Sequence, residues 1–193
     1  MTKIKNIRIS SKQVTLIYLQ SISEDDASNT YVDWLNNKQI NQYLETRHYQ
    51  QTRKTVLSFI KKMIKAPNEF LFTIRFKHNN EHIGNIKVGS INTTYNIADV
   101  SLFIGNQDAW GHGVATQAIQ LISSYSFEQL KLRKLCAGAY KPNIASTKAF
   151  IKAGFKQDGI LVEHYIFNNK PCDLVQVCLF SKQIDQLPKI LIS

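Results

Sequence analysis

The segment DAWGHGVATQAI, residues 108–119, has the composition of a phosphate-binding turn. Gly111 and Gly113 flank a single histidine, and an apolar-periodic segment follows at once. Glycine lets a ligand approach the backbone without a Cβ in its path, and the first turn of a helix leaves about four N–H groups unpaired. A glycine-rich turn that opens directly into a helix is therefore suited to holding an anion such as phosphate.

Two common phosphate-binding patterns fit this segment poorly. A P-loop requires about four residues between its glycines and then Lys followed by Ser or Thr, whereas residues 106–110 separate Gly105 from Gly111 and no such pair follows. The dinucleotide fingerprint is half matched by GHGVAT, but it also requires an acidic residue about 20 positions further on. The segment RKLCAGAY, residues 133–140, contains no acid. Neither pattern is favoured.

The stretch 97–155 instead resembles the GNAT superfamily of acyl-coenzyme A transferases. That family carries Arg/Gln-x-x-Gly-x-Gly/Ala at the start of its central helix, and residues 110–115 match it except that Trp110 replaces the Arg or Gln. The segment NIASTKAFIKAGF, residues 143–155, is similar to the family's downstream Asn-x-x-(Ala/Ser)-x-x-x-(Tyr/Phe)-x-x-x-Gly-Phe motif. YVDWLNNKQINQYLETR, residues 31–47, resembles the Rim-type branch, whose relatives acetylate protein N-termini, amino sugars and polyamines. The likeness extends over roughly residues 13–182.

The resemblance implies a binding site for acetyl-CoA as cosubstrate, with no metal. The backbone of one central strand would pair with the pantetheine arm, and the diphosphate would lie on the amides of the glycine turn. Asn143 has a second role open to it as the N-cap of the following helix. The residues assigned to the cofactor in this way are Leu102, Phe103, Ile104, Trp110, Gly111, His112, Gly113, Val114, Ala115, Thr116, Asn143, Ser146 and Lys148.

Two catalytic residues are assigned by the same resemblance. Asp99 stands where many relatives carry a Glu general base, and its shorter side chain favours a base that acts through water. A solvent-facing strand residue is the alternative interpretation. Many relatives use a Tyr general acid in the downstream motif, but Phe150 stands there and has no proton to donate. Either Tyr140 serves as the acid, with His164 and Tyr165 as further candidates, or the thiolate leaves without a proton donor; a strand Tyr commonly packs with its hydroxyl bonded.

The segment YLETRHY, residues 43–49, links two predicted helices and carries charged groups suited to an acceptor. Glu45 would attract an ammonium, and Arg47 and His48 would meet a carboxylate or phosphate. We assign Glu45, Arg47 and His164 to the acceptor site, with exposed linker surface as the alternative. The formal charge of +10 argues against a polycation such as spermidine. A protein N-terminus or an amino-sugar nucleotide remains open.

The elements that position these residues follow from the periodicity of the apolar positions. Apolar stripes and caps predict helices over 23–36, 51–66, 111–130 and 143–154. Alternation predicts strands over 13–20, 69–77, 81–91, 97–105, 133–140, 161–167 and 173–181. We expect an α/β (α+β) GNAT fold, with a mixed, mostly antiparallel sheet of about six to seven strands, splayed at its centre and flanked by helices. Residues 13–182 would form one domain, after an N-terminal extension (1–12) and before a C-terminal tail (183–193).

Composition and motifs limit the function classes. No apolar run approaches the length of about 18 residues that a membrane span needs, and the N-terminus lacks a signal-peptide pattern. The three cysteines match no zinc or redox spacing, so a cytoplasmic protein without metal or membrane partner is expected. The basic charge suits anionic partners, but no helix-turn-helix, RNP or zinc pattern accompanies it, so nucleic acid is not an expected partner.

The sequence therefore predicts an acetyl-CoA-dependent N-acetyltransferase, in which a primary amine attacks the thioester directly in a ternary complex. The alternative is a non-catalytic module on the same scaffold that binds acyl-CoA or nucleic acid; the charge and Phe150 support it. The sequence leaves open whether the protein forms a homodimer.

Overall fold

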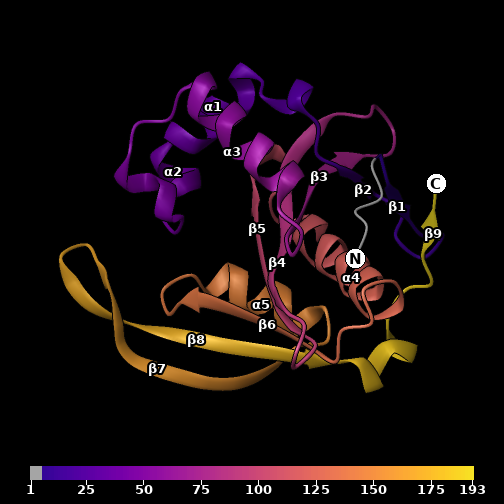
Figure 1. The fold of residues 1–193 in the computed structure, drawn as a ribbon. Coiled ribbons are helices and arrows are strands. Elements are labelled where there is room, and N and C mark those ends of the chain that lie inside the picture. Colours follow the sequence, from indigo (N-terminus) through magenta and orange to yellow (C-terminus); the bar gives the residue numbers. More distant parts are fainter. Residues whose placement is uncertain (1–5) are drawn as a thin grey trace.

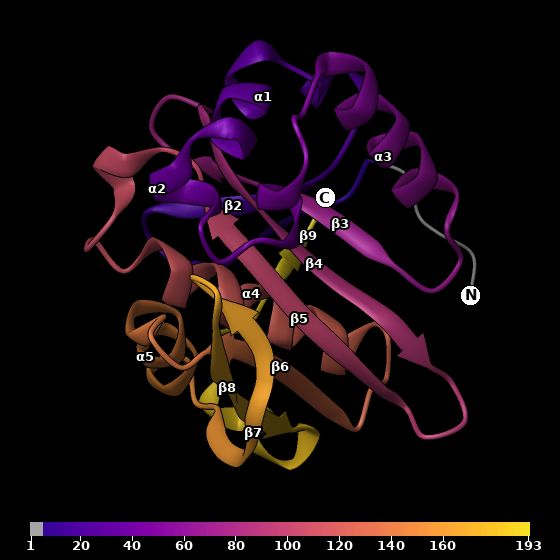
Figure 2. The ribbon, with the colours of Figure 1, turned by 90° about the vertical axis from the view of Figure 1, so that its left-hand side faces the viewer.

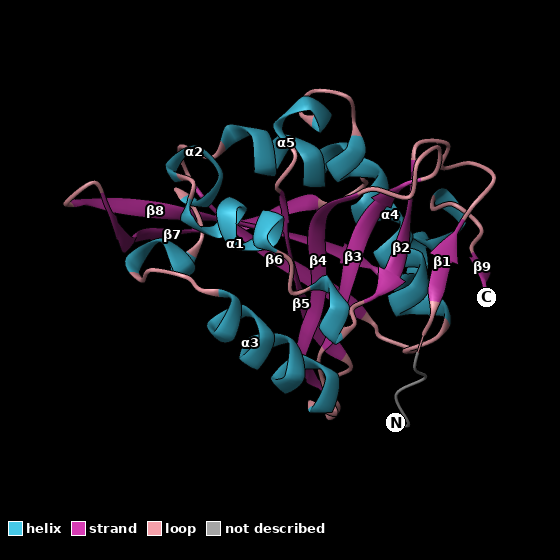
Figure 3. Ribbon diagram, turned by 90° about the horizontal axis from the view of Figure 1, so that it is seen from above, coloured by secondary structure: helices cyan, strands magenta, loops and turns pink. Residues whose placement is uncertain are grey.

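Alternating residues give the two faces of the central sheet different chemistry. The computed structural model describes residues 6–193. In β4 (His82–Asn92), Ile86 and Val88 are fully buried in the main hydrophobic core, whereas the alternate residues Asn85 and Lys87 point to the opposite face. The apolar face packs on helix α4 (Val114–Glu128), and the polar face lies beneath α1 and α3 (Figure 3).

The sheet has nine strands in the order β7-β8-β6-β5-β4-β3-β2-β1-β9 (Figure 1). Every neighbouring pair is antiparallel except β5 and β6, which are parallel. The strands other than β4 are β1 (Arg8–Ser10), β2 (Ile17–Ser21), β3 (Phe70–Phe76), β5 (Ile97–Ile104), β6 (Lys134–Tyr140), β7 (Lys156–Phe167), β8 (Lys170–Phe180) and β9 (Leu191–Ile192). The mixed, mainly antiparallel sheet between helices confirms the predicted fold class.

The predicted count of six to seven strands is wrong because the sequence signal misses two short edge strands. β1 pairs with β2, and Ile9 pairs with Ile192 of β9, so both ends of the chain add to one edge of the sheet. Strands of two or three residues are too short to show alternation. Residues 8–10 and 191–192 belong to the predicted extension and tail; residues 1–5 of that extension lie outside the described chain.

The helices begin where side chains cap them. Thr52 accepts a hydrogen bond from the amide of Thr55 at the start of α3, and Val56, Ile60 and Met63 form its buried stripe. The helices other than α4 are α1 (Asn29–Asn36), α2 (Lys38–Asn41), α3 (Arg53–Lys65) and α5 (Ile144–Lys152). Among residues 6–193, no helix combines the length and the apolar character that crossing a bilayer demands.

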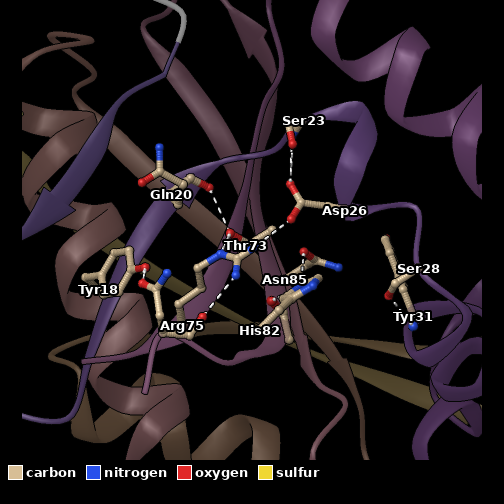
Figure 4. Close-up of polar contacts among 12 residues, drawn as sticks. Tyr18, Gln20, Ser23, Asp26, Ser28, Tyr31, Thr73, Arg75, His82 and Asn85 are labelled. Carbon is tan, nitrogen blue, oxygen red and sulfur yellow. Dashed lines mark hydrogen bonds and ion pairs between the residues drawn. The ribbon is translucent and has the colours of Figure 1, made fainter. Parts of the chain in front are cut away.

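The single helix predicted over 23–36 is wrong. A 3₁₀ turn at Glu24–Asp26 precedes α1, which starts only after Ser28. The Asp26 carboxylate accepts a hydrogen bond from the Ser23 amide at 2.7 Å and also pairs with Arg75 of β3 (Figure 4). Ser28 then caps α1 by accepting a hydrogen bond from the Tyr31 amide, so the helix starts after this residue and remains separate from the turn that holds Asp26.

Candidate active site

The centre of the sheet opens between β5 and β6. These strands pair only at Ile97–Lys134, Ala98–Leu135 and Asp99–Cys136. Beyond those positions β5 stays paired with β4 as far as Ile104, and β6 stays paired with β8 as far as Tyr140. Figure 2 shows β5 running one way while the β7–β8 hairpin, which adjoins β6, turns away from it. The separation confirms the predicted splay and leaves the free edge of β5 available to an added strand-like ligand.

A cavity of about 1210 Å³ occupies this opening and continues to the polar face of the sheet. The predicted site residues that line it are Glu45, Asp99, Leu102, Phe103, Ile104, Trp110, Gly111, Gly113, Val114, Ala115, Thr116, Tyr140, Asn143, Ser146 and Lys148. His112, Arg47 and His164 do not line it. His164 is exposed on β7, where its ring contacts Tyr165 with centroids 4.7 Å apart.

The glycine turn presents unpaired amides to the cavity. Gly111 and Gly113 have φ of +80° and +78°, and a Cβ at either position would meet no heavy atom within 4 Å. The left-handed backbone, rather than lack of space, therefore requires glycine here. Within residues 6–193, no group accepts a hydrogen bond from the amides of residues 111–116. These amides start the 15-residue helix α4, whose dipole adds to their attraction for an anion.

Trp110, the residue that departs from the family pattern, is fixed against the end of β5. Its indole Nε1 donates a hydrogen bond to the Ile104 carbonyl at 3.0 Å, and the residue is 43% exposed. The indole ring thus links the turn to the backbone of β5. Because Trp110 stands at the arginine position, the turn lacks the positive charge that an arginine would supply.

Helix α5 supplies polar and basic groups to the same cavity. Asn143 caps it, accepting a hydrogen bond from the Ser146 amide at 3.2 Å. Lys148 and Lys152 both line the cavity, as their four-residue spacing on a helix allows. The structure adds Lys152 to the residues that the sequence interpretation assigned. Phe150 is buried against Phe155, with ring centroids 5.0 Å apart, and so belongs to the core.

Asp99 lies at the last paired position before β5 and β6 separate. Partial burial raises the pKa of its carboxyl above the ordinary value, and the nearby positive charge of Lys87 opposes that shift. Lys87 pairs with Ser101 on the same sheet face, and both line the cavity. The Asp99 side chain is exposed to solvent, as the alternative of a solvent-facing strand residue requires, and its place in the cavity lining keeps it a candidate general base.

The polar face beneath α1 extends this floor with groups that the sequence interpretation missed. Tyr31 and Asn85 line the cavity, and Asn85 Oδ1 lies 3.1 Å from His82 Nε2 (Figure 4). Burial raises the pKa of Tyr31 and lowers that of His82. Asn85 and Lys87 alternate with apolar residues in β4, and this alternation was the sequence signal for a polar face. Only the packing of α1 over that face shows that it encloses a site.

A chain of three side chains forms the opposite wall. The Tyr140 hydroxyl donates to Glu45 Oε1 at 2.6 Å, and Arg47 Nη2 donates to the same hydroxyl at 3.0 Å. Arg47 Nη1 also donates to the Leu44 carbonyl at 3.0 Å. Tyr140 is 5% exposed, so burial raises the pKa of its hydroxyl, and the bond to Glu45 adds to that effect. The hydroxyl is thus a fixed, bonded group.

Aromatic rings hold this wall in place. Tyr140 stacks on Tyr165 of β7 with centroids 4.9 Å apart, and Tyr43 stacks on Phe167 at 5.2 Å. Tyr43 follows α2 in sequence, so these rings fasten the helical segment to the β7–β8 hairpin, whose tip extends beneath α2 in Figure 1. The carboxylate of Glu45 is therefore presented to the cavity from a rigid support.

A second, smaller pocket of about 540 Å³ lies behind this wall. Arg47 and His48 line it, together with Lys38 at the start of α2. The lining contains no carboxylate, and Gln42 borders both this pocket and the main cavity. We call it the side pocket. Arg47, which the sequence assigns to the acceptor site, therefore lines the side pocket and not the main cavity.

Comparison with known proteins agrees with this geometry. The family model described as an acetyltransferase (GNAT) domain matches residues 17–156. The Bacillus subtilis protein called uncharacterized N-acetyltransferase YoaA is 23% identical over 158 residues, which cover 81% of this chain and 89% of the relative. A second curated relative, the uncharacterized N-acetyltransferase p20 of Bacillus licheniformis, is 24% identical over 145 residues, covering 72% and 81%.

Solved structures share the fold at low sequence identity. Spermidine N-acetyltransferase from Vibrio cholerae, in complex with CoA and spermine, is 21% identical with a TM-score of 0.79, covering 87% of this chain and 97% of that one. An acetyltransferase of the same family from Bacillus anthracis is 16% identical with a TM-score of 0.77, covering 91% and 99%.

Proposed function

Because the chain belongs to the GNAT family of acetyltransferases, we propose that it transfers the acetyl group of acetyl-CoA to a primary amine. The observation that carries the proposal is the run of unpaired amides at residues 111–116 beside the free edge of β5. A coenzyme with a diphosphate and an amide-containing arm needs those two kinds of backbone partner.

The groups that would hold the coenzyme fit its chemistry. The amides of the glycine turn and the positive end of α4 suit the diphosphate, and Lys148 and Lys152 add positive charge on the same side. The free edge of β5 at residues 102–104 suits the amides of the pantetheine arm. Asn143, whose Oδ1 is occupied by capping, retains its amide hydrogens for a further bond. The coenzyme would supply the activated acetyl group as a thioester.

The protein's own residues would handle the amine and its protons. Asp99 accepts the proton of the incoming ammonium through one water molecule, which leaves a neutral amine nitrogen able to attack the acetyl carbonyl. The nitrogen–carbon bond forms, the carbon–sulfur bond breaks and the electron pair leaves on sulfur, while the nitrogen gives up a second proton, which restores the hydroxyl of the group that protonates the sulfur. Tyr140 is the candidate donor of a proton to that sulfur; its hydroxyl donates to Glu45 in the free protein and would have to turn from Glu45 to the sulfur while Arg47 keeps its oxygen in place. Holding both reactants in one cavity supplies a large part of the rate.

The acceptor would enter over the polar face, between Asp99 and Glu45. A protein N-terminus and an amino-sugar nucleotide are the acceptor classes that we consider. The polyamine found in a structural relative suits this chain less well, because a formal charge of +10 opposes the approach of a polycation.

The decisive test combines binding with turnover. Calorimetry with acetyl-CoA should show saturable binding, and an amine panel with detection of the released thiol should show turnover that requires both substrates. Absence of binding at millimolar acetyl-CoA would reject the proposal. Binding without thiol release from any amine, peptide or amino sugar would indicate the non-catalytic module instead.

A further inference from the structure

The side pocket is a basic recess next to a carboxylate-bearing cavity. Lys38, Arg47 and His48 are its ionisable lining residues, and the lining has no acid. Two of its amide side chains are already used, since Asn36 bonds to Gln51 and Asn41 Nδ2 donates to the Leu35 carbonyl at 2.7 Å. Lys38, Arg47 and His48 are thus the lining groups that can offer positive charge to a ligand, beside the neutral polar groups of Tyr49, Gln50 and Asn168.

Arg47 is held in place before any ligand arrives. Its guanidinium donates to the Leu44 carbonyl and to the Tyr140 hydroxyl and pairs with the Glu45 carboxylate at 3.4 Å, and its side chain is only 16% exposed. An arginine fixed in this way loses little conformational entropy when it meets a carboxylate or phosphate, and its planar fork suits both. Lys38, by contrast, is exposed and contributes mainly charge.

The charges are ordered across the wall. Glu45 lines the cavity but not the side pocket, whereas Arg47 lines the side pocket but not the cavity. The Tyr140 hydroxyl lies between them and bonds to both. Arg47 Nη1 also lies 3.4 Å from Glu45 Oε1, so the two charges are in contact, with the carboxylate facing the main cavity and the guanidinium facing the side pocket.

We propose that the acceptor is a zwitterion: a primary amine that also carries a carboxylate or phosphate, with the ammonium attracted by Glu45 and the anionic group bound in the side pocket by Arg47 and Lys38. This inference rests on the proposed function, because it names the substrate class of the same site. It also accords with the excess of basic residues, which favours the approach of an anionic acceptor.

Binding tests the anion subsite without relying on turnover. Calorimetry of the full chain with excess CoA, which occupies the cofactor's own phosphate site, uses glucose 6-phosphate, glucuronate and glucose as probes. The phosphate or the carboxylate sugar should bind and neutral glucose should not. Lys38→Glu should weaken that binding about tenfold by reversing one charge. Lys54→Glu, on α3 outside both pockets, is the matched control and should change nothing.

Turnover then separates the two proposals. With acetyl-CoA, glucosamine 6-phosphate should show a kcat/KM about tenfold above that of glucosamine, and Lys38→Glu should remove the difference. Three outcomes would overturn the zwitterion proposal and leave the proposed acetyltransferase activity standing: equal kcat/KM for the two sugars, a preference for spermidine, or anion binding that Lys38→Glu does not change. Anion binding without thiol release from any amine would count against the acetyltransferase instead.

Discussion

The cofactor side and the acceptor side of this site are built in different ways. Most of the proposed cofactor side is continuous in sequence: β5 ends at Ile104, the turn follows, and α4 begins at Val114, with backbone groups as the main proposed partners and side chains of α5 added to them. The acceptor wall joins Glu45 and Arg47 to Tyr140, which is 95 and 93 residues away, through side chains alone. One half depends on local backbone conformation, and the other depends on long-range packing.

That difference predicts how each half responds to substitution. A backbone site tolerates a change of side chain as long as the left-handed conformation and the open approach remain. A site made of side chains loses a binding group when one of those side chains is replaced, but the surrounding backbone stays intact. Variants of the two halves should therefore separate coenzyme binding from acceptor binding.

The largest effect is expected from Gly113→Glu. A carboxylate at the start of α4 would occupy the anion site, and a non-glycine residue at φ +78° costs about 1–2 kcal/mol of backbone strain. Acetyl-CoA binding by calorimetry should fall below detection. Gly113→Ala bears the same strain without the charge, so it should keep measurable affinity; equal loss in both variants would show that conformation, not charge, decides the site.

A large effect on turnover is expected from Asp99→Asn. Removal of a general base typically costs about 10²-fold or more in kcat. The affinity for acetyl-CoA should stay within about twofold, since none of the assigned coenzyme contacts involves this carboxyl. The wild-type kcat should fall as the pH drops through the raised pKa of Asp99, and the kcat of the variant should not show this decrease. Unchanged kinetics at neutral pH would remove Asp99 from the mechanism.

A moderate effect is expected from Tyr140→Phe, which keeps the stacked ring but deletes the hydroxyl between Glu45 and Arg47. If the hydroxyl only positions those charges, the KM for the acceptor should rise about fivefold, with kcat nearly unchanged. If it also protonates the leaving sulfur, kcat should fall by a larger factor. Steady-state kinetics with a fixed, saturating acetyl-CoA concentration distinguishes the two outcomes.

The smallest effect concerns stability. Asp99 has a pKa that folding raises, so the native state binds its proton more tightly than the unfolded chain, and the stabilisation present at low pH is lost as the pH rises through the folded pKa. Asp99→Asn should therefore have a slightly higher Tm than wild type at pH 7. The difference should vanish below the ordinary Asp range near pH 4. A lower Tm for the variant at pH 7 would mean that the carboxylate is stabilising.

Several features of the site follow from local sequence because they depend on neighbouring residues. The positive φ of Gly111 and Gly113 and the helix that begins at Val114 are consequences of a short segment. The buried stripe of α3 follows equally from periodicity. The start of α1 is also local, because Ser28 caps it, whereas the pairing of Asp26 with Arg75 joins positions 49 residues apart.

The sequence by itself determined the mixed sheet with its glycine turn, since periodicity and backbone conformation are set by adjacent residues. Only the tertiary structure placed Arg47 behind the cavity wall, set His164 apart from the main cavity and brought Lys38 into the same pocket as Arg47. Those positions depend on the stacking of Tyr43, Tyr140, Tyr165 and Phe167 across distant segments. No local pattern encodes such contacts, because each ring gains its partner only when the hairpin and the helices meet.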